Sequence, residues 1–240
     1  MRPLPLALVV LALAVAACGP DAPPAPSADV GVRFDTLRID EPRRAFTVAI
    51  AYPQFENGGA LNAAIRDTVA AFADAFRPAE PPPAFESAPI AVEVRGGPEG
   101  VLLDDGVFST LVAATVTTDG TGATRFTLPI TYDTAVAGPL APRTWFRDDA
   151  AWGEALAAYA EDAAVDRSGR SRVLVAGLDP IRAGEGAVTL GPDSLYLHVP
   201  PFQLSPDPDP LRVAVPYAAV AELARPGGPV ARLAARAAAR

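Results

Sequence analysis

Apolar residues recur along this chain with two different spacings, and each spacing predicts one kind of element. Alternation of apolar and polar residues, which is typical of strands, begins at Val32 and returns over residues 45–52, where Pro53 ends the predicted strand. A helix is predicted next, because one face collects Leu61, Ile65, Val69, Phe72 and Phe76. Pro78 and the three prolines at 81–83 end that helix.

The middle of the chain favours strands and then a second helix. Residues 90–94, 107–117 and 125–132 are rich in β-branched and aromatic residues, with glycine turns between them. We expect the second helix to begin at Asp148 or Asp149, with Asp149 as its cap. Its inward positions are Trp152, Leu156 and Tyr159.

Short elements follow, and together they indicate the fold class. Strands are expected over 172–176, 187–190, 195–199 and 211–215, and a short helix over 217–224. Because strands and helices mix without strict alternation, the sequence predicts an α+β fold with an antiparallel sheet packed by two main amphipathic helices.

The segment 226–240 is an Ala/Arg-rich tail. It has helical spacing, and Arg232, Arg236 and Arg240 lie in register on it. Such stacked arginines suit an acidic groove, but at a chain end we expect a frayed, solvated helix.

The first 18 residues predict where the protein is located rather than what it does. One arginine is followed by an apolar run over residues 4–17, and this run ends in Val15-Ala16-Ala17 directly before Cys18. This is the pattern of a bacterial lipoprotein signal at 1–17. The run is shorter than the roughly 20 residues that span a bilayer, and the alternative is a noncleaved anchor or a buried core segment. Acyl chains on Cys18 would attach the protein to a membrane of the bacterial cell envelope, at the periplasmic face of the outer or inner membrane.

The remaining chain divides into a tether and a folded part. Residues 18–31 form a Pro-rich tether that is too poor in apolar residues to build a core. Residues 32–225 form the α+β domain, with a split into subdomains 32–88 and 89–225 as one option. Cys18 is the only cysteine, so no disulfide forms within the chain. The net charge of −8 disfavours nucleic acid as a partner. It would steer a basic partner toward the protein, but the favoured alternative is that the acidity only keeps a surface protein soluble. The oligomeric state stays open.

Candidate catalytic chemistry centres on His198, the only histidine. In a strand its side chain lies opposite the leucines, and Asp193 and Ser194 are near in sequence, so an envelope hydrolase or glycan-modifying enzyme is one hypothesis. No G-x-S-x-G elbow is present, which favours a solvent-facing or hydrogen-bonded structural histidine. Zinc needs three or four ligands, and Asp207 with Asp209 is too few for a calcium loop, so we predict no metal and no cofactor.

The proline-rich corner after residue 199 is the best candidate for a contact surface. Pro200, Pro201 and Phe202 are stiff or aromatic, and such residues present a recognition edge at low ordering cost. The alternative is that Phe202 folds inward and the prolines only turn the chain. The candidate binding surface therefore comprises Tyr196, His198, Pro201 and Phe202. The predicted function is noncatalytic binding or an accessory role.

Three segments resemble one bacterial domain family. Residues 49–76 combine a strand, Tyr-Pro, Leu-Asn and an amphipathic helix, AIAYPQFENGGALNAAIRDTVAAFADAF. Residues 128–160 and 193–223 resemble its middle and its close, LPITYDTAVAGPLAPRTWFRDDAAWGEALAAYA and DSLYLHVPPFQLSPDPDPLRVAVPYAAVAEL. The arrangement is similar to the RsiV/PdaC-type cell-envelope domain family, found in a lysozyme-sensing anti-sigma factor and a peptidoglycan deacetylase.

The resemblance covers most of residues 33–225 and implies a lysozyme-like protein or peptidoglycan as partner. The chain departs from these relatives in three respects. It shows neither the membrane span of the sensor nor the metal-binding histidines of the deacetylase. Residues 119–124 also stand where the family has a Gly-Gly-Ala-His turn. The resemblance therefore implies the bare domain on a lipid tether.

Overall fold

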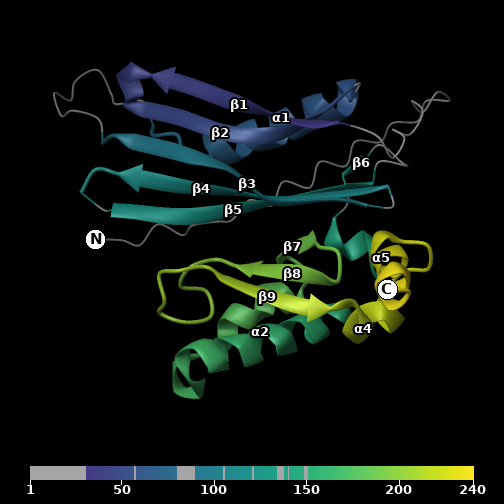
Figure 1. Ribbon diagram of the computed structural model, residues 1–240. Helices are drawn as coiled ribbons and strands as arrows, with labels where there is room; N and C mark the ends of the chain where they lie inside the picture. Colours follow the sequence, from purple (N-terminus) through teal and green to yellow (C-terminus); the bar gives the residue numbers. More distant parts are fainter. Residues whose placement is uncertain are drawn as a thin grey trace.

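The computed structural model describes residues 31–56, 58–79, 90–104, 106–120, 122–133, 138–139, 141–148 and 151–240. The predicted signal at 1–17, Cys18 and nearly all of the tether at 18–31 lie outside these residues. The fold is α+β, as predicted, with mostly antiparallel strands. The described strands form two sheets rather than one, and Figure 1 shows them one above the other.

The larger sheet has six strands in the order β1-β2-β3-β4-β5-β6. Their bounds are Val32–Glu41, Phe46–Phe55, Val92–Asp104, Val107–Thr118, Gly122–Asp133 and Gly138–Pro139. Neighbouring strands are antiparallel except β2 and β3, which are parallel. A parallel pair needs a long crossover, and helix α1 (Gly59–Asp74) lies in that connection.

Helix α1 confirms the helix predicted from residue 61 onward. Ile65, Val69 and Ala73 are fully buried and pack in one core with β-strand residues such as Phe46 and Ile50. Its start is fixed by Asn62, whose side chain bonds the backbone N–H and C=O of Phe55 at 2.8 Å each. The sheet thereby holds the first turn of the helix.

Strand β2 continues past the predicted stop at Pro53 and ends at Phe55. The reason is its pairing: β3 contacts β2 only as far as Ile50, whereas β1 follows β2 throughout. Beyond Ile50 no described strand lies along one edge of β2, so a residue without an N–H fits there.

The smaller sheet is antiparallel and has the order β7-β8-β9. Its strands are Ala187–Leu190, Ser194–Val199 and Leu211–Pro216, close to the predicted ranges. Helix α2 (Trp152–Ser168) covers the outer face of this sheet (Figure 1). The buried face of α2 is mostly small, with Leu156, Ala157, Ala160 and Ala164, so the helix lies close to the strands.

Further α-helices and several 3-10 turns complete the described chain. The α-helices are α3 (Asp179–Arg182), α4 (Tyr217–Val220) and α5 (Pro229–Ala238). The 3-10 turns are η1 (Pro42–Arg44), η2 (Pro142–Thr144), η3 (Arg170–Arg172), η4 (Val175–Leu178) and η5 (Ala221–Leu223).

Two local predictions for the second half are wrong. Residues 172–176 form no strand, because η3 and η4 occupy this stretch and Leu174 donates its N–H to a loop carbonyl, that of Leu204. Helix α2 begins at Trp152 with Ala151 as its cap, three residues after Asp149, which lies outside the described residues. The ring of Trp152 stacks on Phe146 at 4.8 Å, and this contact anchors the first turn in place of a polar cap.

The expectation of a frayed tail is also wrong. In α5, Val230 and Leu233 are fully buried in the core of the second half. On the polar side, Arg232 lies 3.2 Å from Asp133, Arg236 pairs with Asp104, and Arg240 lies 3.3 Å from Asp193. These carboxylates end strands or turns of both sheets, so the helix joins the two halves.

The described residues form two hydrophobic cores, one for each sheet. A division between residues 88 and 89 would separate β2 from β3, which pair in one sheet; the sheets separate between β6 and β7. No helix within the described ranges is long and apolar enough to cross a membrane.

Candidate functional site

A layer of polar side chains lies where the two sheets meet. On β4, Phe108 and Val112 point into the α1 core, so Ser109 points to the opposite face. The Ser109 hydroxyl lies 2.8 Å from that of Thr131 and accepts the N–H of Leu190 at 2.8 Å. We call Ser109, Thr131, Thr189 and His198 the polar seam; all four side chains are buried.

His198 belongs to this seam and is a hydrogen-bonded, buried histidine. Its Nε2 lies 2.8 Å from the hydroxyl of Thr189, and the residue is 6% exposed. Burial and the nearby Arg212 guanidinium lower the pKa of His198 to about 4. The imidazole is therefore neutral at pH 7. The sequence prediction of a hydrogen-bonded histidine holds, whereas its solvent-facing alternative does not.

Tyr196 lies two residues before His198 on the same face of β8. The guanidinium of Arg212, on β9, stacks over the ring of Tyr196, with 3.8 Å between the guanidinium carbon and the ring centroid. Arg212 is also the register partner of His198 across β8 and β9. Sequence analysis missed this arginine because its pairing depends on the strand register.

The corner between β8 and β9 holds Pro201 and Phe202. Phe202 has a φ of 63° and its side chain is 56% exposed, so it does not fold inward. A left-handed backbone costs an ordinary residue about 1–2 kcal/mol, so the loop must be held by other contacts. The strain lies at an exposed aromatic ring, which is typical of a functional position.

Several contacts hold this corner in place. The Phe202 N–H donates to the carbonyl of Asp207 at 3.1 Å, and the side-chain amide of Gln203 donates to the carbonyl of Gly177 at 2.7 Å. A Cβ at Gly177 would collide with the Gln203 carbonyl oxygen, so only glycine fits there. The corner is therefore built against η4 with close backbone contact.

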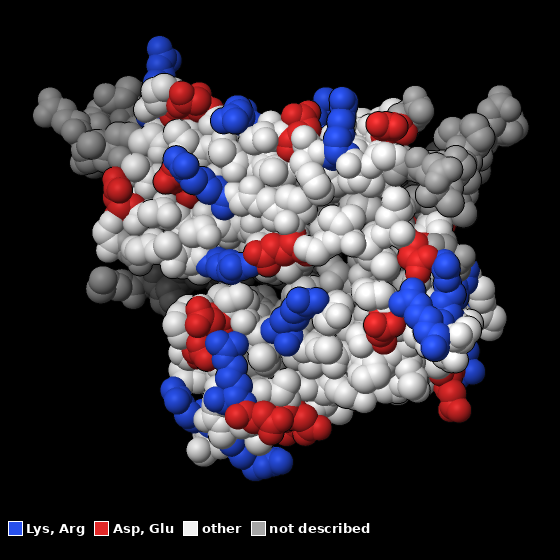
Figure 2. All heavy atoms as spheres, in the orientation of Figure 1, with Lys and Arg blue, Asp and Glu red and all other residues white. Residues whose placement is uncertain are grey.

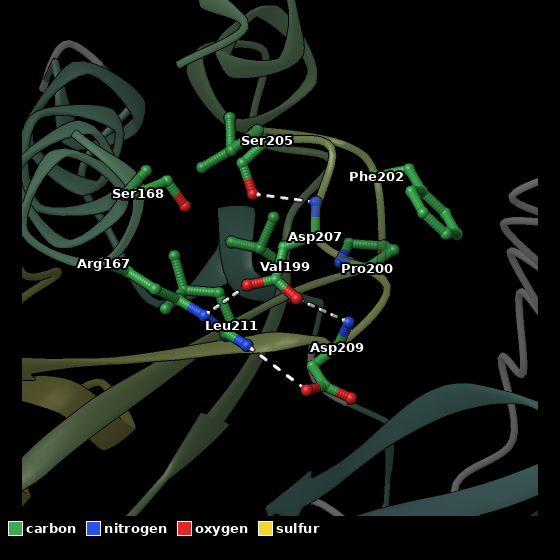
Figure 3. Close-up of a pocket in the computed structure, with 11 residues that line it drawn as sticks. Arg167, Ser168, Val199, Pro200, Phe202, Ser205, Asp207, Asp209 and Leu211 are labelled. Carbon is green, nitrogen blue, oxygen red and sulfur yellow. Dashed lines mark hydrogen bonds and ion pairs between the residues drawn. The ribbon is translucent and has the colours of Figure 1, made fainter. Parts of the chain in front are cut away.

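A small pocket lies beside the corner (Figure 3). Arg167 of α2 reaches Asp207 at 2.8 Å and Asp209 at 3.7 Å, and Phe202 points away from these three groups. The pocket holds about 10 Å³, which is room for about one water molecule. The two aspartates considered above as calcium ligands contact Arg167, and these contacts tie the loop to α2.

The structure therefore brings together only part of the predicted surface. Tyr196 and His198 share one face of β8, Pro201 and Phe202 lie in the following corner, and Cys18 is outside the described residues. Among the described residues, no group of three or more His, Cys, Asp or Glu side chains is arranged to hold a metal ion.

Comparison with known proteins identifies the fold. No protein-family model and no curated protein matches the chain. A DUF3298 family member from Bacteroides fragilis NCTC 9343 has a TM-score of 0.56 at 11% identity, covering 86% of this chain and 98% of that one. A DUF3298 family protein from Pseudomonas aeruginosa PAO1 has a TM-score of 0.55 at 13% identity, covering 83% and 97%. The structural neighbours of this chain are thus DUF3298 proteins, a bacterial domain family, and the likeness is one of fold.

Proposed function

We propose that this chain is a noncatalytic binding or accessory protein of the bacterial cell envelope, attached to the membrane by lipid on Cys18. The observation that carries the proposal is Phe202, an exposed aromatic residue held in a left-handed conformation by a fixed loop. A rigid aromatic anchor binds a partner with little loss of conformational entropy. The RsiV/PdaC-type resemblance supports the envelope setting.

The surroundings of Phe202 suit contact with a macromolecule. Leu174 and Val175 are 47% and 59% exposed, and the backbone bond from Leu174 to Leu204 places their segment beside the corner. Exposed apolar side chains in one region are typical of interaction sites. From the resemblance, we propose a lysozyme-like protein or peptidoglycan as the partner, and the net charge of −8 favours a basic one.

A retention experiment tests this binding. The chain from residue 31 to 240, which contains every described element, is immobilised and challenged with lysozyme and with peptidoglycan fragments. Phe202→Ala is expected to weaken retention at least about tenfold, as for an aromatic anchor. Phe34→Ala is the matched control, because Phe34 is 53% exposed on β1. Failure of the unaltered chain to retain either probe would remove the proposed partners, and equal retention by Phe202→Ala would remove the proposed surface.

The lipid anchor has a separate test. Metabolic labelling with a radioactive fatty acid should mark the full chain in bacteria and should not mark Cys18→Ala. Labelling of that variant would contradict attachment at Cys18.

A hydrolase centred on His198 is the alternative function. The contact at 2.8 Å between His198 Nε2 and the Thr189 hydroxyl resembles a base beside a nucleophile. The two residues are only 6% and 5% exposed, however, so the hydroxyl offers little surface to a substrate. This burial favours the binding proposal. Hydrolysis of a glycan or ester substrate that His198→Gln abolishes would reverse the choice.

A further inference from the structure

Arg212 differs from several other arginines of the second half. Arg167, Arg182 and Arg225 each contact a carboxylate. The side chain of Arg212 forms no hydrogen bond or ion pair with a described residue, and its contact is the ring of Tyr196, 3.8 Å from the guanidinium carbon. Stacking holds the guanidinium by its flat face and leaves its N–H edges available for a ligand.

The β9 side of this face is open to solvent. Arg212 and Ala214 of β9 are exposed, and they lie across from His198 and Tyr196 of β8. His198 is neutral at pH 7, so it neither competes with Arg212 for an anion nor neutralises it. A charged donor group that is ordered but unpaired is thus present at the surface.

The larger sheet also carries basic side chains on the face that holds the polar seam. Figure 2 shows a dark slit between the two sheets, with both basic and acidic side chains beside it. On the larger sheet, Arg95 and Arg125 flank Thr115 in one cross-strand row, on the same face as Ser109 of the polar seam. A hollow of about 310 Å³ lies over this row, at the lower end of the range for small-ligand sites.

We propose that Arg212, stacked on Tyr196, binds a carboxylate group of a small ligand that enters the slit between the two sheets. A guanidinium edge donates two parallel N–H···O bonds to a carboxylate, and this geometry is stronger than a single neutral bond. Arg95 and Arg125 pair with Glu93 and Glu99, so the proposed contact rests on Arg212. This site is distinct from the Phe202 corner and does not depend on it.

His198 provides the measurement, because it is the only histidine of the chain and the register partner of Arg212. Citrate is the probe, added to residues 31–240 while sodium chloride keeps the ionic strength constant. We expect saturable shifts of the His198 imidazole NMR signals. Bound citrate should also raise the pKa of His198, because it offsets the positive charge that helps to lower it.

Variants separate this site from general anion binding. Arg212→Gln should weaken citrate binding at least about tenfold, whereas Arg172→Gln, which alters another exposed arginine of the same half, should leave it unchanged. Equal thermal midpoints would show that both variants fold. Absence of any His198 shift, or the same shift in Arg212→Gln, would overturn the proposal. If inorganic phosphate bound more tightly than citrate, and this binding depended on Arg212, the ligand group would not be a carboxylate as proposed.

Discussion

Leu233→Ala tests how the C-terminal helix is held. Leu233 lies on α5, is fully buried and packs in the core of the second half. Replacing a buried leucine by alanine costs about 2–5 kcal/mol, because transfer free energy is lost and a cavity remains. The variant should therefore unfold much more easily than the unaltered chain.

The ion pairs on the same helix should matter less. The side chains of Arg236 and Arg240 are 52% and 53% exposed, and exposed ion pairs contribute about 0–1 kcal/mol each. Arg240→Gln should consequently cost well under half of what Leu233→Ala costs. Apolar burial, and not charge, is expected to dominate the docking of α5.

Thermal and urea unfolding of residues 31–240 measure both effects. For a domain of this size, 1 kcal/mol shifts the midpoint by about 2–4 °C, so Leu233→Ala should lower it by about 4–20 °C. Ala235→Ser, at an exposed position of α5, is the control and should change stability by no more than about 0.5 kcal/mol. If Leu233→Ala unfolded at the same midpoint as the unaltered chain, α5 would not be docked in solution.

Three further predictions concern the seam and the corner. The pKa of His198 is lowered from 6.5 to about 4 in the folded chain. Between pH 6.5 and pH 4 the unfolded chain therefore binds more protons than the folded chain. As the pH falls through this range, the free energy of unfolding should drop by up to about 3 kcal/mol because of this histidine. The difference in unfolding free energy between the unaltered chain and His198→Asn, measured against pH, should show this loss; a difference that does not change with pH would contradict it. Thr189→Val should cost about 1–3 kcal/mol in urea unfolding, because it leaves the buried His198 Nε2 without its hydroxyl partner, and an unchanged midpoint would refute that reasoning. Phe202→Gly should stabilise the fold by about 1 kcal/mol, because glycine adopts the φ of 63° without strain, while it removes the proposed contact; a lower thermal midpoint would show that Phe202 packs inward.

Much of the secondary structure could be predicted where periodicity and local chemistry agree. The α1 helix follows from apolar residues such as Ile65 and Val69 at helical spacing, and β7 matches the predicted range of 187–190. Residues 172–176 misled the prediction, since their apolar and β-branched composition suits a strand. Their backbone bonds instead go to the corner loop and within turns.

The candidate site was predictable only in part. Sequence pattern drew attention to His198 as the only histidine and to Phe202 in a proline-rich corner. It gave no sign of Arg212 on Tyr196, because 16 positions separate them and only the register of β8 and β9 brings them together. The left-handed φ of Phe202 was likewise invisible, because phenylalanine rarely adopts it.

The sequence by itself determined the α+β class and most element positions, because apolar spacing and turn residues act over a few neighbours. It also predicts a lipoprotein-type signal at 1–17, which stays a prediction because those residues lie outside the described ranges. Tertiary structure decided how the strands divide into two sheets, and it decided that the arginine-rich tail docks on Asp104, Asp133 and Asp193. It also created the polar seam, where Ser109 meets Leu190 from 81 positions away. Such contacts depend on how distant segments pack, and the spacing of residues along the chain does not predict that packing.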